Sequence, residues 1–504
     1  MLQRCLIYAG WIAVMAVALW LRVHDLADRP IHFDEATGAL IFAEYIEIDD
    51  YRFDPTHFHG PLLSLSTTPI AKGFGQSSWQ ELSVSMLRTG PVIAGLLIVL
   101  TPLLWLRTIG PRSTLAAAAL LASSPLLVYY NRMYIHESWL ALYGMLTAAA
   151  IYYVITRPTI LRSILAGLAA GLMFATKETV AISLMSWTAA GFACWLLMKN
   201  YRCKSGAAPE LKAYLLPAIC FAVSLLLTAS VFYGGGLIDA FRTYFVYETT
   251  DGHDKALGYY LKMLVLPKHS LGIWWSEGSV LCFGILTCIF AALRKKGVPS
   301  VAICFLAVGA AVHVLIYSVI SYKTPWLMLL PWSLACLLAG CVFSGKASHC
   351  NCVGKSVVLY GGFGLCLLFQ GNQAIQASGR LSNHADNPYA YVPTSKNITQ
   401  LPAWLNELDD LIGEESLEPI AVIGQSYWPL PWYLRDFYPI GYWPNAPEEI
   451  TSYNVIIAMP ENTAACNQLL AETHVPLPRT LRSNVPVTLY LKNDIWNAWT
   501  EPEK

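Results

Sequence analysis

Long apolar stretches recur along most of the chain and limit its possible folds more than any other feature. A helix that spans a bilayer needs about 20 mostly apolar residues. About eleven segments of this kind begin near Leu6, Val92, Leu115, Leu140, Ile164, Val180, Ala213, Ile273, Val301, Trp326 and Ser356. Because 55% of the residues are hydrophobic and only 13% are charged, the sequence predicts a polytopic, mainly α-helical membrane protein.

The distribution of basic residues predicts the orientation of these segments. If the N-terminus is cytoplasmic, every loop predicted to be inside is basic, as cytoplasmic loops usually are. The first apolar segment has no small-residue cleavage site before Arg22, which favours an uncleaved anchor over a signal peptide. We therefore expect a multi-pass protein of the cytoplasmic (inner) membrane. Its net charge is zero, which gives no basis for a nucleic-acid partner.

An odd number of spans would place the C-terminal part outside the cytoplasm. We expect a transmembrane domain at residues 1–370 and a small extracytoplasmic α/β domain at residues 371–504. The α/β prediction rests on helix-like segments such as Leu401–Leu411, which alternate with strand-like segments at Pro419–Ile423, Asn454–Met459 and Val485–Leu491.

The segment Tyr427–Leu434 of this domain is unusually rich in aromatic residues. Its prolines exclude a continuous helix and favour an extended run. Aromatic rings of this kind stack on sugars or lie at lipid headgroups. Packing between the domain and the membrane part explains them equally well.

Two adjacent carboxylates follow the first apolar segment, within an acid-rich external loop at about residues 23–83. Asp34 and Glu35 precede a helical pattern that includes Ala39, Phe42 and Ala43, and this helix is expected to lie along the membrane surface. Asp34 as N-cap and Glu35 as a first-turn acid would explain both residues locally. Alternatively, the pair is a general base, a metal ligand or a binder of a sugar hydroxyl.

The same loop contains two histidines before a Gly-Pro turn. His57 and His59 are spaced so that they can converge with Asp34 on a divalent metal ion, or bind a phosphate when protonated. A metal ion is the one cofactor that these residue types suggest. Polar residues that simply form an exposed turn are the alternative interpretation.

Further ionisable residues lie where the outer ends of spans are expected. Ionisable residues at that depth are costly and are candidates for function. Arg132, Lys177 and Lys323 could together neutralise a lipid phosphate, with neighbouring candidates for substrate or metal contact at His136, Glu137 and Glu178. Alternatively, the cations reach toward water at helix ends, and Lys177 pairs with Glu178.

These motifs carry a family resemblance. An Asp-Glu pair after the first span, followed by a loop with a His-Gly-Pro turn, resembles the GT-C glycosyltransferases related to protein O-mannosyltransferases and lipid A aminoarabinose transferases. A similarity to the family described as flippase-activity-associated proteins spans most of the chain and is carried by the strings HFDEATGAL, FDPTHFHGPLL, FATKETVAI, YKTPWLMLLPWSLA and YWPLPWYLRDFYPIGYW.

The GT-C resemblance implies a fold, a substrate class and residue roles. It implies an acidic residue on the first external loop near the acceptor nucleophile, opposite a polyprenyl-phosphate-linked sugar. Asp34 is at that position, as general base or partner of a catalytic metal, and Glu35 supports it. The expected activity is transfer of the sugar to a glycan, lipid or protein acceptor on the extracytoplasmic face.

Two other functions fit the same sequence. A non-enzymatic flippase or transporter component is suggested by the family description, and ionisable residues in the middle of spans would favour it. A structural subunit of a larger envelope complex would tolerate replacement of the carboxylates.

Impermeant thiol labelling of intact cells tests the predicted sidedness. Asn383→Cys should react without permeabilisation, because residue 383 is expected outside. Native Cys203, in a basic loop expected inside, is the internal control and should react only after permeabilisation. Labelling of residue 383 that requires permeabilisation would contradict the odd span number.

Overall fold

The chain folds into two compact units, which the computed structural model describes over residues 2–48, 53–56, 59–202, 210–246, 252–293, 298–344, 353–413 and 417–500. The first unit comprises Met1–Leu26, Asp49–Phe74 and Ser85–Arg380. The second comprises Ala27–Ile48, Gly75–Val84 and Leu381–Lys504. Residues 27–48, which follow the first apolar helix, therefore fold with the C-terminal part of the chain.

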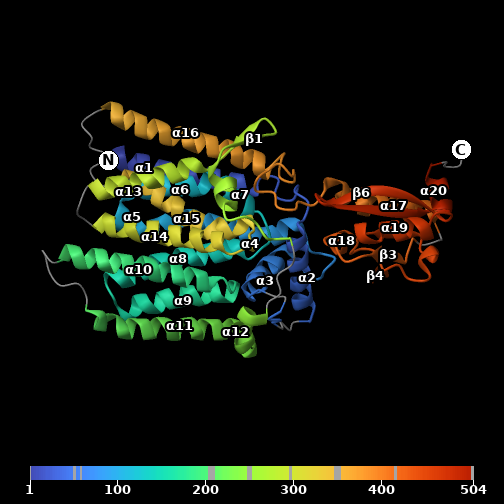
Figure 1. The fold of residues 1–504 in the computed structure, drawn as a ribbon, viewed down its shortest axis with the longest axis horizontal. Coiled ribbons are helices and arrows are strands. Elements are labelled where there is room, and N and C mark those ends of the chain that lie inside the picture. Colours follow the sequence, from blue (N-terminus) through green and yellow to red (C-terminus); the bar gives the residue numbers. More distant parts are fainter. Residues whose placement is uncertain are drawn as a thin grey trace. The chain divides into compact units, whose positions relative to one another are not determined.

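The first unit is a bundle of long helices that run side by side (Figure 1). Its helices are α1 (Leu2–Val23), α3 (Leu62–Phe74), α4 (Val84–Leu100), α5 (Leu106–Ile109), α6 (Pro111–Ser123), α7 (Pro125–Tyr130), α8 (Glu137–Thr156), α9 (Ile160–Thr176), α10 (Val180–Arg202), α11 (Leu215–Tyr233), α12 (Leu237–Val246), α13 (Gly278–Leu293), α14 (Val298–Val319), α15 (Leu329–Gly340) and α16 (Val353–Ser378). A two-stranded antiparallel hairpin consists of β1 (Lys268–Ser270) and β2 (Ile273–Trp275).

The helices of this unit confirm the polytopic membrane architecture. Among the described residues, 7 helices are long and apolar enough to cross a bilayer, and α9 and α13 are shorter apolar helices. Every apolar segment predicted from the sequence overlaps a helix of the bundle. The segment expected from Ile273 differs at its start, because β2 occupies its first residues and α13 begins at Gly278.

Helix α15 is the centre of the bundle. It contacts α6, α8, α13 and α14, and the apolar segment around it, Pro325–Phe343, is 94% buried inside the protein. A buried carboxylate joins this segment to its neighbours: Glu277 accepts hydrogen bonds from the Ser124 hydroxyl at 2.5 Å and the Trp332 indole at 2.8 Å. Burying a carboxylate is tolerated only with such donors.

Small residues allow α9 and α11 to pack closely. Gly167 and Gly171 are four residues apart on α9 and face α11. A methyl group added at Gly171 would lie 2.5 Å from the Thr228 Cβ, and one at Gly167 would overlap the Phe221 carbonyl. This spacing of glycines is typical of close helix pairs in membranes, where packing rather than hydrophobic burial drives association.

The second unit is an α/β domain built on a five-stranded mixed sheet with the strand order β4-β3-β5-β7-β6. Strands β4, β3 and β5 are parallel, whereas β7 runs antiparallel to β5 and β6. Its elements are α2 (Phe33–Ile48), α17 (Leu401–Ile412), β3 (Ile420–Ile423), α18 (Leu430–Tyr433), β4 (Ile440–Trp443), β5 (Val455–Ala458), α19 (Pro460–Leu469), β6 (His474–Arg482), β7 (Val485–Lys492) and α20 (Asn493–Thr500).

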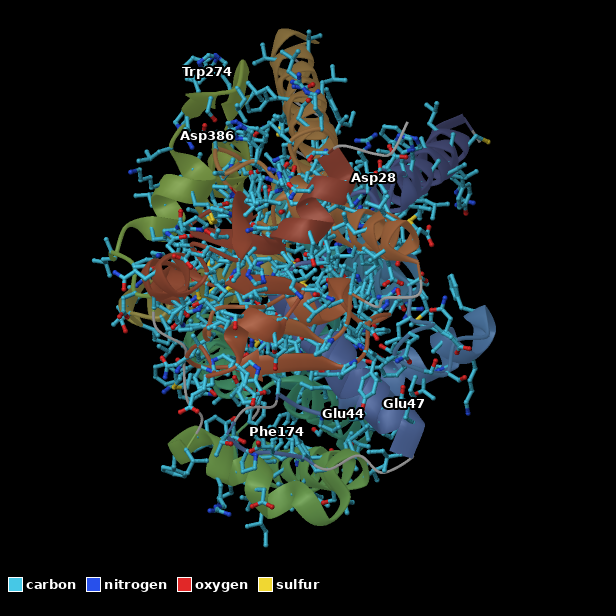
Figure 2. The ribbon with its side chains drawn as sticks, turned by 90° about the vertical axis from the view of Figure 1, so that its right-hand side faces the viewer. Asp28, Glu44, Glu47, Phe174, Trp274 and Asp386 are labelled. Carbon is cyan, nitrogen blue, oxygen red and sulfur yellow. The ribbon has the colours of Figure 1, made fainter. Side chains whose placement is uncertain are left out.

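Helix α2 has a buried apolar face and an exposed acidic face. It buries Ala36, Ala39 and Phe42, which recur at helical spacing. Glu44 and Glu47 on the same helix are exposed (Figure 2), and Glu47 accepts a hydrogen bond from the backbone N–H of Trp79 at 2.6 Å. The short segment 75–84 is thereby attached to α2.

The structure corrects the expectation for the aromatic segment Tyr427–Leu434. A continuous helix is absent from this described segment, as expected, but residues Leu430–Tyr433 form the one-turn helix α18 instead of an extended run. Pro431 lies in the first turn of α18, where a helix tolerates proline because no N–H donor is needed there.

Gly167→Ala should lower the thermal stability of the purified protein, because overpacking the α9–α11 contact costs about 1–3 kcal/mol. A methyl group added at Gly361 in α16 would have no neighbouring atom within 4 Å, so Gly361→Ala should be neutral or stabilising by up to about 1 kcal/mol. Equal melting temperatures for the two variants would contradict close packing at Gly167.

Candidate functional site

The start of helix α2 is fixed by a reciprocal cap centred on His32. The backbone N–H of Asp34 donates to His32 Nδ1 at 3.2 Å, and the backbone N–H of His32 donates to Glu35 Oε2 at 3.0 Å. This is the arrangement of a capping box, with histidine as the capping residue. Because α2 begins at Phe33, the expectation that Asp34 is the N-cap is wrong by two residues.

The His32 ring is held in one tautomer. Its Nε2 lies 2.9 Å from the carbonyl oxygen of Tyr391, which can only accept, so we assign the proton to Nε2 and leave Nδ1 as the acceptor for Asp34. Burial lowers the pKa of His32 to about 3, although the charge of Glu35 opposes that shift. His32 is therefore neutral at physiological pH, and the cap persists.

The two adjacent carboxylates have different surroundings. The Glu35 side chain is 1% exposed, and its Oε2 also lies 3.9 Å from Arg29 Nη2. The Asp34 side chain is 37% exposed. The structure thus gives Glu35 a place in the cap and leaves Asp34 accessible to a reactant.

Arg482, at the end of β6, is close enough to Asp34 for the two charges to interact. Its guanidinium lies over the Phe33 ring at 5.0 Å from the ring centroid, and its Nη2 donates to the Ser426 carbonyl at 3.0 Å. Burial lowers the pKa of Arg482, whereas the negative charge of Asp34 raises it. Sequence reasoning missed this residue, since no local pattern connects position 482 with position 34.

A second polar cluster lies in the membrane unit and contains His59, His136, Glu137, Lys177 and Glu178. Lys177 Nζ is 2.7 Å from Glu137 Oε1, and His59 Nδ1 is 3.1 Å from Glu178 Oε2. The His59 and His136 rings meet edge to face at 5.1 Å between centroids. The ion pair of Lys177 with Glu137 was not expected from the sequence, which suggested Glu178 as the partner.

Charge pairing controls protonation in this cluster. Burial alone would raise the pKa of Glu178, but the charge and hydrogen bond of His59, together with the charge of Lys177, lower it to about 2. Burial, helped by the charges of His59 and Lys177, lowers the pKa of His136 well below its usual range. At neutral pH Glu178 is an anion and His136 is neutral.

Arg132 and Lys323, the other two side chains predicted to bind the donor phosphate, stabilise helix ends. Arg132 donates to the carbonyl oxygens of Leu21 and Asp25, each at 2.9 Å, at the end of α1. Lys323 donates to the Lys255 carbonyl at 2.9 Å and to the Ile320 carbonyl just after α14. Carbonyls at helix ends lack intrahelical donors, and these cations supply them.

The predicted metal site is not assembled by the residues that the structure describes. His57 lies outside the described residues. Within the described ranges, no group of three or more His, Cys, Asp or Glu side chains could hold a metal ion. A divalent ion held by Asp34, His57 and His59 therefore stays a prediction.

Several solved structures have a similar fold. ArnT from Cupriavidus metallidurans in the apo state superimposes with a TM-score of 0.58 at 15% identity, covering 96% of this chain and 98% of that one. The same protein bound to undecaprenyl phosphate gives a TM-score of 0.56 at 15% identity, covering 95% and 98%. The archaeal oligosaccharyltransferase AglB from Archaeoglobus fulgidus, with an inhibitory peptide and dolichol-phosphate, gives 0.51 at 13% identity, covering 90% and 69%.

These similarities extend over nearly the whole chain and show that it has the GT-C fold, as the sequence motifs predicted. No family model matches the chain, and no curated protein matches it. The narrower resemblance to flippase-activity-associated proteins therefore stays a prediction.

Glu178→Gln should destabilise the protein at pH 7 but much less at low pH. Because the pKa of Glu178 is lowered from 4.5 to about 2, its stabilising contribution is complete above about pH 4.5 and is lost as the pH falls toward 2. The difference in free energy of unfolding between wild type and variant should be on the order of 3 kcal/mol at pH 7 and should shrink in thermal melts at pH 3. A constant difference would contradict the ionised pair.

Proposed function

We propose that this protein is a membrane glycosyltransferase that moves a sugar from a polyprenyl-phosphate carrier to an acceptor on the extracytoplasmic face of the inner membrane. The observation that carries the proposal is the accessible carboxylate of Asp34 at the first turn of α2, in a chain with the GT-C fold throughout. ArnT has been solved with undecaprenyl phosphate, and AglB with dolichol-phosphate, which supports a lipid-phosphate donor here.

The proposed reaction is a single displacement. Asp34 accepts the proton of the acceptor hydroxyl while the oxygen forms a bond to the anomeric carbon. The bond between that carbon and the phosphate oxygen breaks, and its electron pair leaves with the polyprenyl phosphate. One displacement inverts the anomeric configuration. The role of Glu35 in this scheme is to fix the α2 cap that positions Asp34.

The donor phosphate is proposed to be bound by the positive side chains Arg132, Lys177 and Lys323. Each already donates to a carbonyl or carboxylate, so their positions are fixed before the donor arrives. Fixed charges stabilise a departing phosphate without the cost of reorganisation. His59, His136, Glu137 and Glu178 would adjust the charge around Lys177 and hold it in place.

A flippase or transporter component is the second candidate, and one observation favours it. His313 is fully buried in α14, where its ring nitrogens lie 2.9 Å from the Gly309 carbonyl and 3.0 Å from the Ser183 hydroxyl. Ionisable groups in the middle of spans often mark transport pathways. A transporter would move the lipid-linked glycan without breaking the bond between sugar and phosphate.

Asp34→Asn should abolish most of the transfer from a polyprenyl-phosphate sugar. Loss of a general base typically costs at least roughly 10²-fold in rate, whereas the neutral isostere preserves the cap through the unchanged His32 and Glu35. The matched control is Asp28→Asn, which changes an exposed acid of the same unit (Figure 2) and should keep wild-type turnover. Equal rates for wild type and Asp34→Asn in nanodiscs would remove Asp34 as the base.

A further inference from the structure

In the second unit a closely packed loop follows the carboxyl end of β3, the central parallel strand. Gly424, directly after β3, has a φ of 118°, and a methyl group there would lie 2.5 Å from Met459 Cβ. The backbone N–H of Gly424 donates to the Trp443 carbonyl, and that of Gln425 donates to Glu461 Oε1, both at 2.8 Å. Open α/β sheets bind ligands at this edge, outside the carboxyl ends of parallel strands.

Aromatic rings gather beside this loop. The Tyr427 ring stacks on Trp428 at 6.1 Å between centroids and contacts the Tyr442 ring at 4.9 Å. Tyr442 is 38% exposed. We call Tyr427, Trp428 and Tyr442 the aromatic platform. A large ring this exposed, in contact with a second ring at the ligand-binding edge of the sheet, indicates a binding surface.

Arg482 links the aromatic platform to Asp34. It donates to the carbonyl of Ser426, the neighbour of Tyr427, and lies over Phe33, the neighbour of Asp34. Its Nε is buried and has no hydrogen-bond partner among the described residues. A buried guanidinium donor without a partner is costly, and a ligand hydroxyl or carboxylate between the platform and Asp34 would satisfy it.

We infer that the aromatic platform binds a saccharide, the acceptor of the transfer reaction, and that Arg482 directs its hydroxyl toward Asp34; this inference rests on the proposed function. Sugar rings present apolar C–H faces that stack on aromatic rings, while their hydroxyls need polar partners. The platform provides both kinds of contact, since the exposed Gln425 and Ser426 lie beside its rings. A lipid surface would instead be matched by clustered basic residues.

Saturation-transfer NMR with the full chain in nanodiscs tests this inference. The probes are a short mannose oligosaccharide and a short N-acetylglucosamine oligosaccharide, compared with an uncharged peptide and with empty nanodiscs. At least one saccharide should bind, and Tyr442→Ala should weaken its binding roughly tenfold. Tyr442→Phe keeps the ring and should bind as wild type. The matched control is Tyr438→Ala, a tyrosine of the same unit that is 82% exposed and lies outside the platform.

The same variants separate the two proposals. Asp34→Asn should still bind the saccharide. If the wild-type protein binds the saccharide through Tyr442 but transfers no sugar, the proposed function is wrong and the saccharide site remains. If Tyr442→Ala has wild-type thermal stability and transfers sugar with an unchanged KM for the acceptor, the aromatic platform is not the acceptor site, whereas the proposed transferase activity remains. Binding of the peptide with the same Tyr442 dependence, and of neither saccharide, would also overturn the saccharide assignment.

Discussion

Every backbone N–H and C=O in a membrane-embedded fold must find a partner within the protein, because the hydrocarbon core offers none. Helix interiors meet this demand by themselves, but helix ends do not. In this protein charged side chains supply many of the missing partners. Arg132 serves carbonyls at the end of α1, Glu277 accepts from the N–H of Leu126 in the first turn of α7, and Lys323 serves the Ile320 carbonyl after α14. Such residues are fixed in place by the fold, and this is the condition for preorganised binding of a charged substrate.

The same demand explains why two adjacent acids differ in their availability for chemistry. A helix start requires acceptors for its first N–H groups, and Glu35 and the neutral His32 ring provide them. Asp34 is released from the capping role that its position in the sequence suggested. Its carboxylate, 37% exposed and close to Arg482, is the one member of the pair that a reactant can reach. The hydrogen bonds at the start of α2 therefore assign Glu35 to the cap and leave Asp34 accessible.

Much of the fold could be predicted because apolar runs determine both spans and buried strands. Strands β3 and β5 are apolar at every position and completely buried, and both were predicted within two residues at each end. Strand β6 was missed because Pro476 and Pro478 argue against a strand, although an edge strand tolerates them. The candidate site was predicted only in part. Asp34 and Glu35 stand out in the local sequence. Arg482 interacts with Asp34, and Glu137 pairs with Lys177, but each pair joins distant segments that only the tertiary fold brings together.

The fate of the bond between sugar and phosphate distinguishes a glycosyltransferase from a transporter. Purified protein in nanodiscs would be given a synthetic polyprenyl-phosphate sugar labelled at the anomeric carbon, with a nucleotide sugar offered in parallel and saccharide acceptors on the outer side. We expect a glycosylated product with inverted anomeric configuration and free polyprenyl phosphate, formed from the lipid donor and not from the nucleotide sugar. Intact donor that merely changes leaflet, or transfer from the nucleotide sugar alone, would contradict this expectation.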